Sequence, residues 1–277
     1  MRRNLRLALN HIVAPRTDID DFFALARRLG LHGVEIRNDL AGTAIADGTP
    51  APVVRAAAER HGVRILSINA LQRFNDWTAD RAAEARDLAD YAATCGAAAL
   101  VLCPVNDRRF RPDEPARLEG LRHALSELLP ILAARNLQGF VEPLGFLESS
   151  LRLKRDAIDA IAAVGGRATF KVLHDTFHHA ISGEESFFAD ETGLVHVSGV
   201  EEERLPVASM RDAHRVLVGP RDRLDNIGQV EALLGAGYRG FFSFEPFAES
   251  VHDLSDPASA LEESVAWLSG DNASEAA

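Results

Sequence analysis

The strongest constraint on the fold is a regular alternation of strand-like and helix-like stretches along the 277 residues. Each strand-like stretch is short and mostly apolar, and a longer stretch with apolar residues at helical spacing follows it. We expect strands at residues 5–10, 33–37, 63–69, 98–104, 138–142, 168–175, 194–198 and 240–245. Strand 98–104 is almost wholly apolar, which is typical of a strand buried on both faces of a parallel sheet.

The intervening stretches predict helices, and several carry recognisable start and stop signals. Thr17 and Asp20 have the spacing of a capping pair, and Gly30 is placed to end the helix that they would open. Thr78 is placed to open a long alanine-rich helix that Gly96 would end. Helices are expected at residues 17–29, 52–61, 78–95, 115–135, 153–164, 225–235 and 257–269.

Eight strands alternating with helices over this length predict an α/β fold, a single (β/α)8 TIM barrel. The structural alternative is a doubly wound open sheet, which would favour a Gly-x-Gly-x-x-Gly loop after an early strand. That motif is absent from the sequence. No linker or shift in composition divides the chain. We therefore predict one domain over residues 1–277, with a polar and frayed tail at residues 271–277.

Composition excludes several functional classes. Hydrophobic residues make up 47% and charged residues 26%, as in an ordinary globular protein. A formal net charge of −11 argues against binding nucleic acid through its phosphates. Cys95 and Cys103 are too few for a disulfide framework and are expected to be reduced and buried. Because no long apolar run is present, and none follows the charged start at residues 1–4, we expect no membrane span, no export and a cytoplasmic location.

The sixth predicted strand ends in a polar cluster. Asp175 closes an apolar run, and His174, His178 and His179 lie within four residues of it. One interpretation is that Asp175 caps the next helix while the histidines are solvated. The other is that the carboxylate and an imidazole one turn later face a cation or a polar substrate.

Other predicted strands also carry ionisable residues near their carboxyl ends. Glu142 ends the fifth strand, Asp175 the sixth and Glu245 the eighth, and His196 lies in the seventh. In a barrel these side chains would converge at one rim, where carboxylates repel one another unless a divalent cation lies among them. The pattern predicts a site for one Mn²⁺, Mg²⁺, Co²⁺ or Zn²⁺ ion. Taken singly, each residue could instead be a rim ion pair or a hydrogen-bonded core histidine.

These residues resemble the xylose isomerase-like barrel superfamily of sugar isomerases and epimerases over nearly the whole chain. Within it, the sequence looks most similar to the 2-keto-myo-inositol (inosose) isomerases. The residues that carry the resemblance are Leu9-Asn10, Val34-Glu35-Ile36-Arg37, Leu66-Ser67-Ile68-Asn69-Ala70-Leu71, Phe74-Asn75, Glu142, Asp175-Thr176-Phe177-His178, His196-Val197 and Ser243-Phe244-Glu245-Pro246-Phe247.

The resemblance implies a metal-dependent isomerase or epimerase of a ketose or keto-polyol that works through an enediolate. It assigns one divalent metal ion to Glu142, Asp175, His196 and Glu245, and it gives both glutamates acid and base roles. No organic cofactor is implied. The partner is a small sugar or cyclitol, and the chain is compatible with a homo-oligomer. The residues expected to face substrate are His178, Arg215, Asn10 and Asn69.

One departure and three rival functions accompany the resemblance. The family commonly has a Pro-Gly-x-Gly loop after the arginine, where this chain reads Val218-Gly219-Pro220-Arg221-Asp222. An inosose dehydratase-type lyase would use the same kind of metal site. An endonuclease IV-like nuclease would need more metal ligands and a DNA-binding surface. A non-catalytic binding protein would have no need of an intact ligand set. Strand alternation places His174 away from Asp175, as a structural residue.

Overall fold

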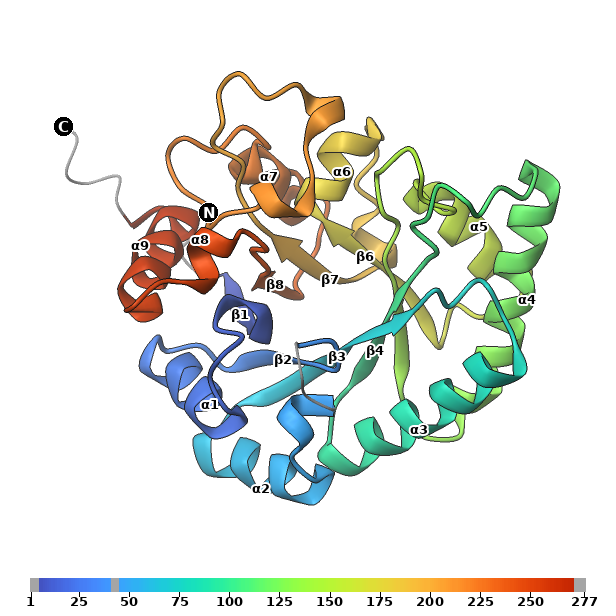
Figure 1. Ribbon diagram of the computed structural model, residues 1–277, viewed down its shortest axis with the longest axis horizontal. Coiled ribbons are helices and arrows are strands. Elements are labelled where there is room, and N and C mark those ends of the chain that lie inside the picture. The colour runs from blue at the N-terminus through green and yellow to red at the C-terminus, as the bar shows by residue number, and fades with distance from the viewer. Residues whose placement is uncertain (1–4, 41–44, 272–277) are drawn as a thin grey trace.

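The computed structural model describes residues 5–40 and 45–271, and within them eight parallel strands close into one barrel. Each strand pairs with its neighbours in the chain, and β8 pairs with β1. Figure 1 shows the strands in the centre with the helices around them. The strands are β1 (Arg6–Asn10), β2 (Gly33–Arg37), β3 (Arg64–Gln72), β4 (Ala99–Cys103), β5 (Gln138–Val141), β6 (Phe170–Asp175), β7 (Thr192–Val197) and β8 (Phe241–Phe244).

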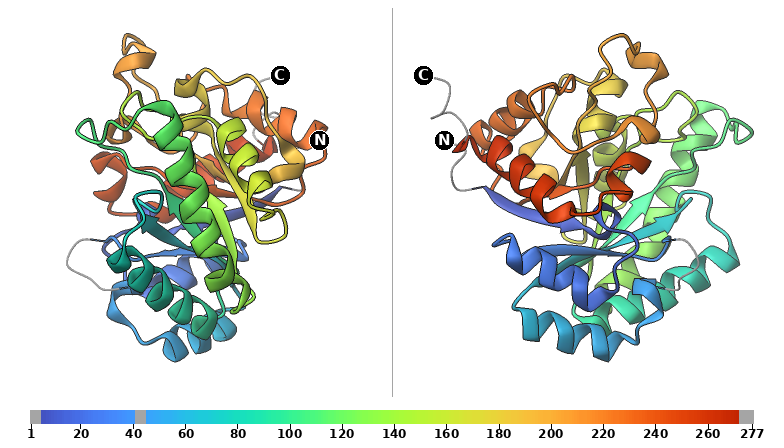
Figure 2. Two further views of the ribbon diagram at one scale, coloured as in Figure 1. Left: turned by 90° about the vertical axis from the view of Figure 1, so that its right-hand side faces the viewer. Right: turned by 60° about the vertical axis from the view of Figure 1, so that its left-hand side comes forward.

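A helix follows each strand and returns the chain to the other end of the barrel, so that the next strand runs parallel. Both views in Figure 2 show these helices along the outside of the molecule. The predicted (β/α)8 barrel is therefore confirmed. The helices are α1 (Ile19–Arg28), α2 (Ala51–His61), α3 (Ala79–Cys95), α4 (Glu114–Ala133), α5 (Lys154–Ala163), α6 (Thr176–Ser182), α7 (Asn226–Gly235), α8 (Glu249–His252) and α9 (Pro257–Ser269).

Most predicted helix ends are confirmed, and one start signal is wrong. Thr78 caps α3 as expected. At α1, however, the cap is Asp18, whose carboxylate accepts a hydrogen bond from the Asp21 amide at 2.9 Å. The Thr17 hydroxyl donates instead to the Ala14 carbonyl at 2.8 Å. The turn that precedes α1 thus engages Thr17 and leaves the next residue to cap the helix.

Apolar side chains form two layers on either side of the strands. One cluster fills the barrel interior and includes Leu66, Val101, Phe140, Leu173 and Leu194. A larger cluster lies between the outer faces of the strands and the helices. Because both faces are covered, most strand residues are buried. The apolar interior ends before the carboxyl ends of the strands, where polar residues take its place.

A bulge in β7 sets the register at those carboxyl ends. Successive residues of β6 pair with Thr192 and then with Leu194, so Gly193 is an extra residue in β7. Beyond the bulge Asp175 pairs with His196. Without the extra residue, Asp175 would pair one position earlier in β7, with a residue that points to the opposite face. The bulge therefore places these two polar side chains beside each other.

Some expectations concern residues outside the described ranges. Residues 1–4 and the predicted tail at 271–277, apart from Asp271, lie outside them. Cys95 and Cys103 are buried and unpaired, as expected. None of the described helices has the length and apolarity needed to cross a membrane.

The bulge gives the first prediction. A Cβ atom on Gly193 would lie 2.7 Å from Cδ1 of Phe140 and 2.9 Å from Cβ of Lys171. We expect Gly193→Ala to lower the free energy of unfolding by roughly 1–3 kcal/mol, as overpacking does, in urea denaturation. Gly235→Ala is the matched control, because a Cβ at that helix end meets nothing within 4 Å. Equal stability of the two variants would contradict the steric argument.

Candidate functional site

Four potential metal ligands meet at the carboxyl ends of β5 to β8. Glu142 follows β5, Asp175 ends β6, His196 lies in β7 and Glu245 follows β8. One donor atom from each side chain lies within 4.8 Å of those from the other three, and all four residues are buried. The structure thus brings together the four residues that the sequence pattern grouped. Three carboxylates and one imidazole fit a divalent cation.

Nδ1 of His196 lies at the centre of this group. It is 2.9 Å from Oε2 of Glu245, 3.3 Å from Oε1 of Glu142 and 3.9 Å from Oδ2 of Asp175. All three carboxylates therefore direct one oxygen toward the same ring nitrogen. A cation among these oxygens could use the Nδ1 lone pair as its fourth ligand.

The other ring nitrogen of His196 is held by Glu35 on β2. Nε2 lies 3.0 Å and 3.2 Å from the two oxygens of Glu35. The carboxylate also accepts hydrogen bonds from the Ser67 hydroxyl at 2.6 Å and the Asn10 amide at 3.4 Å. A carboxylate behind a ligating histidine keeps the proton on the far nitrogen and fixes the plane of the ring. Glu35 thus prepares His196 for binding through Nδ1.

The charge of the site makes proton and cation competitors. Burial by itself would lower the pKa of His196, but Glu245, Glu35 and Glu142 raise it well above its usual range. Without a bound cation, the surrounding carboxylates therefore favour a protonated His196. Because a ligating imidazole must give up the proton on its ligating nitrogen, a bound cation would release it.

The two carboxylate oxygens of Asp175 make different contacts. Oδ1 accepts hydrogen bonds from the backbone amides of Phe177 at 2.7 Å and His178 at 3.0 Å, which caps α6. Oδ2 lies 2.5 Å from Nη2 of Arg215, on the side of His196. The helix cap of one interpretation and the site-facing carboxylate of the other are therefore both present, but His174 and His178 are buried and not solvated. The helix cap fixes the carboxylate that faces the site.

Arg215 is almost fully buried between two aromatic rings. Its guanidinium carbon lies 4.7 Å from the ring centroid of Phe247 and 5.1 Å from that of Phe177. Nη2 also donates to Oε2 of Glu245 at 3.0 Å, and Nε donates to the Ser198 hydroxyl at 3.0 Å. A planar cation stacked in this way is held in one orientation. Arg215 thus bridges two carboxylates of the site.

Glu245 has the largest set of hydrogen-bond donors in the site. Its Oε1 accepts from Arg37 at 2.9 Å, Asn10 at 3.2 Å and Asn69 at 3.3 Å, while Oε2 faces Arg215 and His196. Burial would raise the pKa of Glu245, but His196, Arg215 and Arg37 together hold it below its usual range. Glu245 is therefore a strongly charge-compensated carboxylate.

Glu142 is held far more loosely. Its Oε1 faces His196, and its Oε2 accepts a hydrogen bond from the Cys103 thiol at 3.2 Å. A thiol is a weak donor. In the described residues no arginine forms an ion pair with this carboxylate, on which Arg215 acts only at longer range. Burial, together with the nearby Glu142 carboxylate, raises the pKa of Cys103 well above its usual range, so the thiol keeps its proton. The two glutamates therefore differ sharply in their surroundings.

His178 is oriented by the loop after β5. Its Nδ1 accepts a hydrogen bond from the backbone amide of Gly145 at 3.3 Å, so Nε2 of the neutral ring carries the proton. A side chain on Gly145 would place a Cβ 2.5 Å from Cγ1 of Ile181 and 2.9 Å from the Ser182 amide. Glycine is therefore needed for this close approach between the loop and α6.

A cavity of about 420 Å³ lies above the four ligands, within the roughly 300–1,000 Å³ that is typical of small-molecule sites. Of the residues predicted to face substrate, His178, Arg215 and Asn69 line it. Asn10 is fully buried and contacts Glu35 and Glu245 instead. The rest of the lining is mixed: the polar members are Arg37, Asp39, Gln72, Arg73, Cys103, Asn106, Glu142, Asp212 and Glu245, and the apolar members are Pro104, Leu144, Phe146 and Phe247.

Three residues that shape the site have no role predicted from the sequence. Glu35 holds His196, Arg37 binds Glu245, and Cys103 binds Glu142. Glu35 and Arg37 are two charged residues on one face of a buried strand, which is unusual. That alternation was the signal that could have identified them. No comparable signal distinguishes Cys103 from a packing residue.

The outer face of β6 carries a second polar cluster. Lys154, at the start of α5, donates to Nδ1 of His174 at 3.0 Å and to Nδ1 of His179 at 2.8 Å. His174 also contacts Gln229 of α7 at 2.9 Å, so it points away from Asp175 as expected. Burial lowers the pKa of Lys154 to about 8 although Glu184 opposes the shift. This cluster ties α5, α6 and α7 to the strand that carries Asp175.

Comparison with known proteins yields one family and several similar structures. The family model described as Xylose isomerase-like TIM barrel matches residues 23–270. A xylose isomerase domain containing protein from Salmonella typhimurium LT2 is 36% identical, with a TM-score of 0.88 over 97% of this chain and 98% of that chain. No curated protein sequence matches.

Two further solved structures share the fold at lower identity. The IOLI protein, described with a binding zinc atom, is 18% identical, with a TM-score of 0.83 over 96% of this chain and 99% of that chain. D-psicose 3-epimerase from Clostridium cellulolyticum H10, solved with D-tagatose, is 15% identical, with a TM-score of 0.70 over 96% and 97%. At these sequence identities the similarity shows a shared barrel fold only.

The contact between Glu35 and His196 gives the second prediction. Glu35→Gln keeps the shape of the side chain but removes the charge that fixes the imidazole. We expect the affinity for Zn²⁺ or Mn²⁺ to fall by about 10- to 100-fold, the usual cost of losing such a partner, in titrations against a competing chelator. Glu249→Gln, on the exposed start of α8, is the control. Unchanged affinity of the Glu35 variant would show that His196 needs no such support.

Lys154 gives a prediction about pH. Its pKa is about 8 in the folded protein and 10.5 in a free chain, so the unfolded state binds more protons between these values. The stability cost of burying the charge is complete below pH 8 and disappears as the pH rises toward 10.5. Relative to Lys154→Met, the wild-type unfolding free energy should rise by about 2 kcal/mol from pH 8 to pH 10. An equal difference in unfolding free energy between the wild type and Lys154→Met at both pH values, measured by urea denaturation, would contradict this.

Proposed function

This chain belongs to the xylose isomerase-like TIM-barrel family, and we propose that it is a divalent-metal-dependent isomerase or epimerase of a ketose or keto-polyol. The observation that carries this proposal is the pair of glutamates, Glu142 and Glu245, that share one ligand cluster and both line the cavity above it. Such a pair can hold an ion and exchange protons with a substrate in the same place.

The four clustered residues, Glu142, Asp175, His196 and Glu245, would hold the cation. When bound there, a divalent cation polarises the substrate carbonyl and stabilises the negative charge that develops on its oxygen. The protein supplies the rest of the chemistry. Moving a carbonyl to the adjacent carbon requires a group that removes a proton next to the ketone and a group that returns one.

The unequal surroundings of the two glutamates suggest unequal roles. Glu142, with a thiol and no guanidinium on its carboxylate, is the better candidate to accept the substrate proton. Glu245 faces Arg37 and Arg215 and is held ionised, so it accepts a proton less readily. We assign the first proton removal to Glu142. Glu142, protonated by this step, would return a proton to the adjacent carbon. Glu245 would position the substrate and pass the proton of the neighbouring hydroxyl to the former carbonyl oxygen.

Three further residues would orient the substrate. The proton on Nε2 of His178 can donate a hydrogen bond to an oxygen in the cavity. Asn69 and Arg215 also line the cavity, although Arg215 already donates hydrogen bonds to Asp175 and Glu245. The charged and amide side chains among the lining residues suit a molecule with many hydroxyl groups. Among such substrates we propose 2-keto-myo-inositol, on the sequence resemblance.

A lyase that removes water from an inosose is the alternative. It would use the same cation and the same base but would need an acid beside the departing hydroxyl. His178, with its proton directed away from Gly145, is the group placed to serve. Product analysis separates the two functions, because an isomerase preserves the mass of the substrate and a dehydratase does not.

Replacing each glutamate in turn tests the proposed chemistry. Glu142→Gln and Glu245→Gln keep an oxygen ligand but remove the carboxylate. We expect kcat on 2-keto-myo-inositol to fall by roughly 100-fold or more in both, as after loss of a general base, with metal still bound. Metal content is measured by elemental analysis, and Glu249→Gln is the control. A variant that keeps nearly full turnover would remove that glutamate from the proton path.

The fate of the migrating hydrogen tests the enediolate route. A proton carried by a carboxylate exchanges with solvent, so product formed in D₂O should contain deuterium at the new C–H bond. Nuclear magnetic resonance of the product measures this directly. Complete retention of the substrate hydrogen over many turnovers would mean that hydrogen moves as a hydride, and the acid–base assignment would then be wrong.

A further inference from the structure

A second cavity, of about 460 Å³, adjoins the one above the metal ligands. Three loops, which follow β4, β5 and β7, contribute to both cavities. Neighbouring residues in each loop face opposite sides. Asn106, Leu144 and Asp212 line the cavity above the ligands, and Asp107, Gly145 and Arg211 line the second one. We call the second one the outer cavity.

Phe146 is the common wall, because it lines both cavities. Its buried ring lies edge-on to His178, with centroids 5.1 Å apart, and the guanidinium carbon of Arg211 lies 5.7 Å from its centroid. One aromatic ring therefore separates a side chain of the inner cavity from a cation of the outer one. A ligand that spans both cavities would lie along the edge of this ring.

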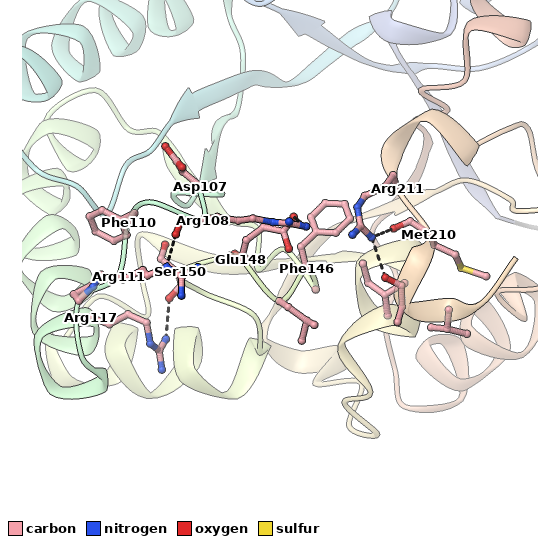
Figure 3. Close-up of a pocket in the computed structure, with 17 residues that line it drawn as sticks. Asp107, Arg108, Phe110, Arg111, Arg117, Phe146, Glu148, Ser150, Met210 and Arg211 are labelled. Atoms are coloured by element: carbon pink, nitrogen blue, oxygen red, sulfur yellow. Dashed lines mark hydrogen bonds and ion pairs between the residues drawn. The ribbon is translucent and has the colours of Figure 1, made fainter.

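The outer cavity is rich in positive charge although the chain carries a net charge of −11. Four arginines line it, against two carboxylates, Asp107 and Glu148. In Figure 3, Arg111 and Arg117 lie toward one end and Arg211 toward the other, with Glu148 and Phe146 between them. An excess of guanidinium groups in a concave site favours an anionic ligand.

Arg211 is the cation best placed to bind such a ligand. Its Nη1 donates to the carbonyls of Ala208 at 3.0 Å and Met210 at 2.6 Å, which fixes the half-buried side chain. Within residues 5–40 and 45–271 its hydrogen-bond partners are His214 and backbone carbonyls, and it forms no ion pair with a carboxylate. Arg108 is weakly paired, with Nη2 3.7 Å from Oε1 of Glu148. Arg117, by contrast, is already engaged by Asp156 at 3.3 Å.

We propose that the outer cavity binds an anionic group, a phosphate or a carboxylate, of a substrate whose keto-polyol part occupies the inner cavity. This rests on the proposed function, and it adds acidic ketoses to neutral 2-keto-myo-inositol as substrates of the same site. Arg211 and Arg108 are the residues that bind the anion. The Phe146 centroid lies 5.1 Å from that of His178 and 5.7 Å from the guanidinium carbon of Arg211, so one ring separates the group that would face the keto-polyol from the group that would bind the anion.

A matched set of ligands tests this. D-Fructose, D-fructose 6-phosphate and D-fructuronate share the ketone and differ at carbon 6. With the metal-loaded full-length protein, isothermal titration calorimetry should give a Kd at least about tenfold lower for one or both anions than for D-fructose. The preferred anion identifies the terminal group as phosphate or carboxylate. Equal affinity for all three sugars would overturn the proposal.

Variants locate the anion. In Arg211→Gln the affinity ratio between the preferred anion and D-fructose should fall about fivefold, and in Arg108→Gln/Arg211→Gln it should approach one. Arg28→Gln, exposed at the end of α1, is the control and should keep the full ratio. An anion advantage that survives in the double variant would also overturn the proposal, because the charge would then be bound elsewhere.

Turnover separates this proposal from the proposed function. Conversion of neutral 2-keto-myo-inositol, followed in the wild type, tests the isomerase chemistry without using the outer cavity. Titration with inorganic phosphate alone tests the outer cavity without using the inner one. Phosphate binding that is lost in the double variant supports the anion site even if no ketose is turned over. Phosphate binding unaffected by the double variant counts against it.

Discussion

Everything at the rim of this barrel depends on keeping several carboxylates together in a buried place. Glu35, Glu142, Asp175 and Glu245 lie around one imidazole, and each is almost inaccessible to water. Buried like charges are costly unless cations or hydrogen-bond donors compensate them. The compensation comes from His196 and from two buried arginines. The arginines are fixed by groups outside the cluster: Asp39 pairs with Arg37, and two aromatic rings enclose Arg215.

The barrel supplies this arrangement through strand geometry. Because side chains alternate along a strand, adjacent residues of β6 serve opposite sides of the sheet. Asp175 faces the ligand cluster, while His174 contacts Lys154 and Gln229 outside the barrel. The bulge at Gly193 then brings β7 into register, so that His196 lies beside Asp175. Helix capping completes the effect, since the carboxylate oxygen not used by the site is held by the first turn of α6.

The sequence predicted the parts of this structure that depend on periodicity. The eight strands, the longer helices and the grouping of Glu142, Asp175, His196 and Glu245 follow from position in the repeat, whereas the short helices α6 and α8 were not predicted. What it missed depends on contacts between distant residues, such as the pairing of Glu35 with His196 across the barrel. The helix cap at Thr17 failed for a local reason: Asp18 was an equally good cap, and a preceding turn engaged the threonine. The third strand also runs to Gln72, past its predicted end, because bulges in its pairing with β2 and β4 add residues that a simple alternation does not reveal.

The strands therefore position the ligand cluster, and the loops line the cavities that a substrate would enter. The ligand cluster is fixed by residues within strands or directly after them, where the hydrogen-bonded barrel allows little movement. The loops after β4, β5 and β7 contribute to both cavities, and the inner cavity is also walled by β2, β3 and the loops after β2, β3 and β8. Such loops can change without altering strand register. Phe146 lies between the two cavities. It packs on His178 and Phe177 of α6 and also faces Arg211. A change in these loops would therefore alter which molecule reaches the cluster before it alters the cluster itself. The chemistry and the choice of substrate can in this way be varied separately in one barrel.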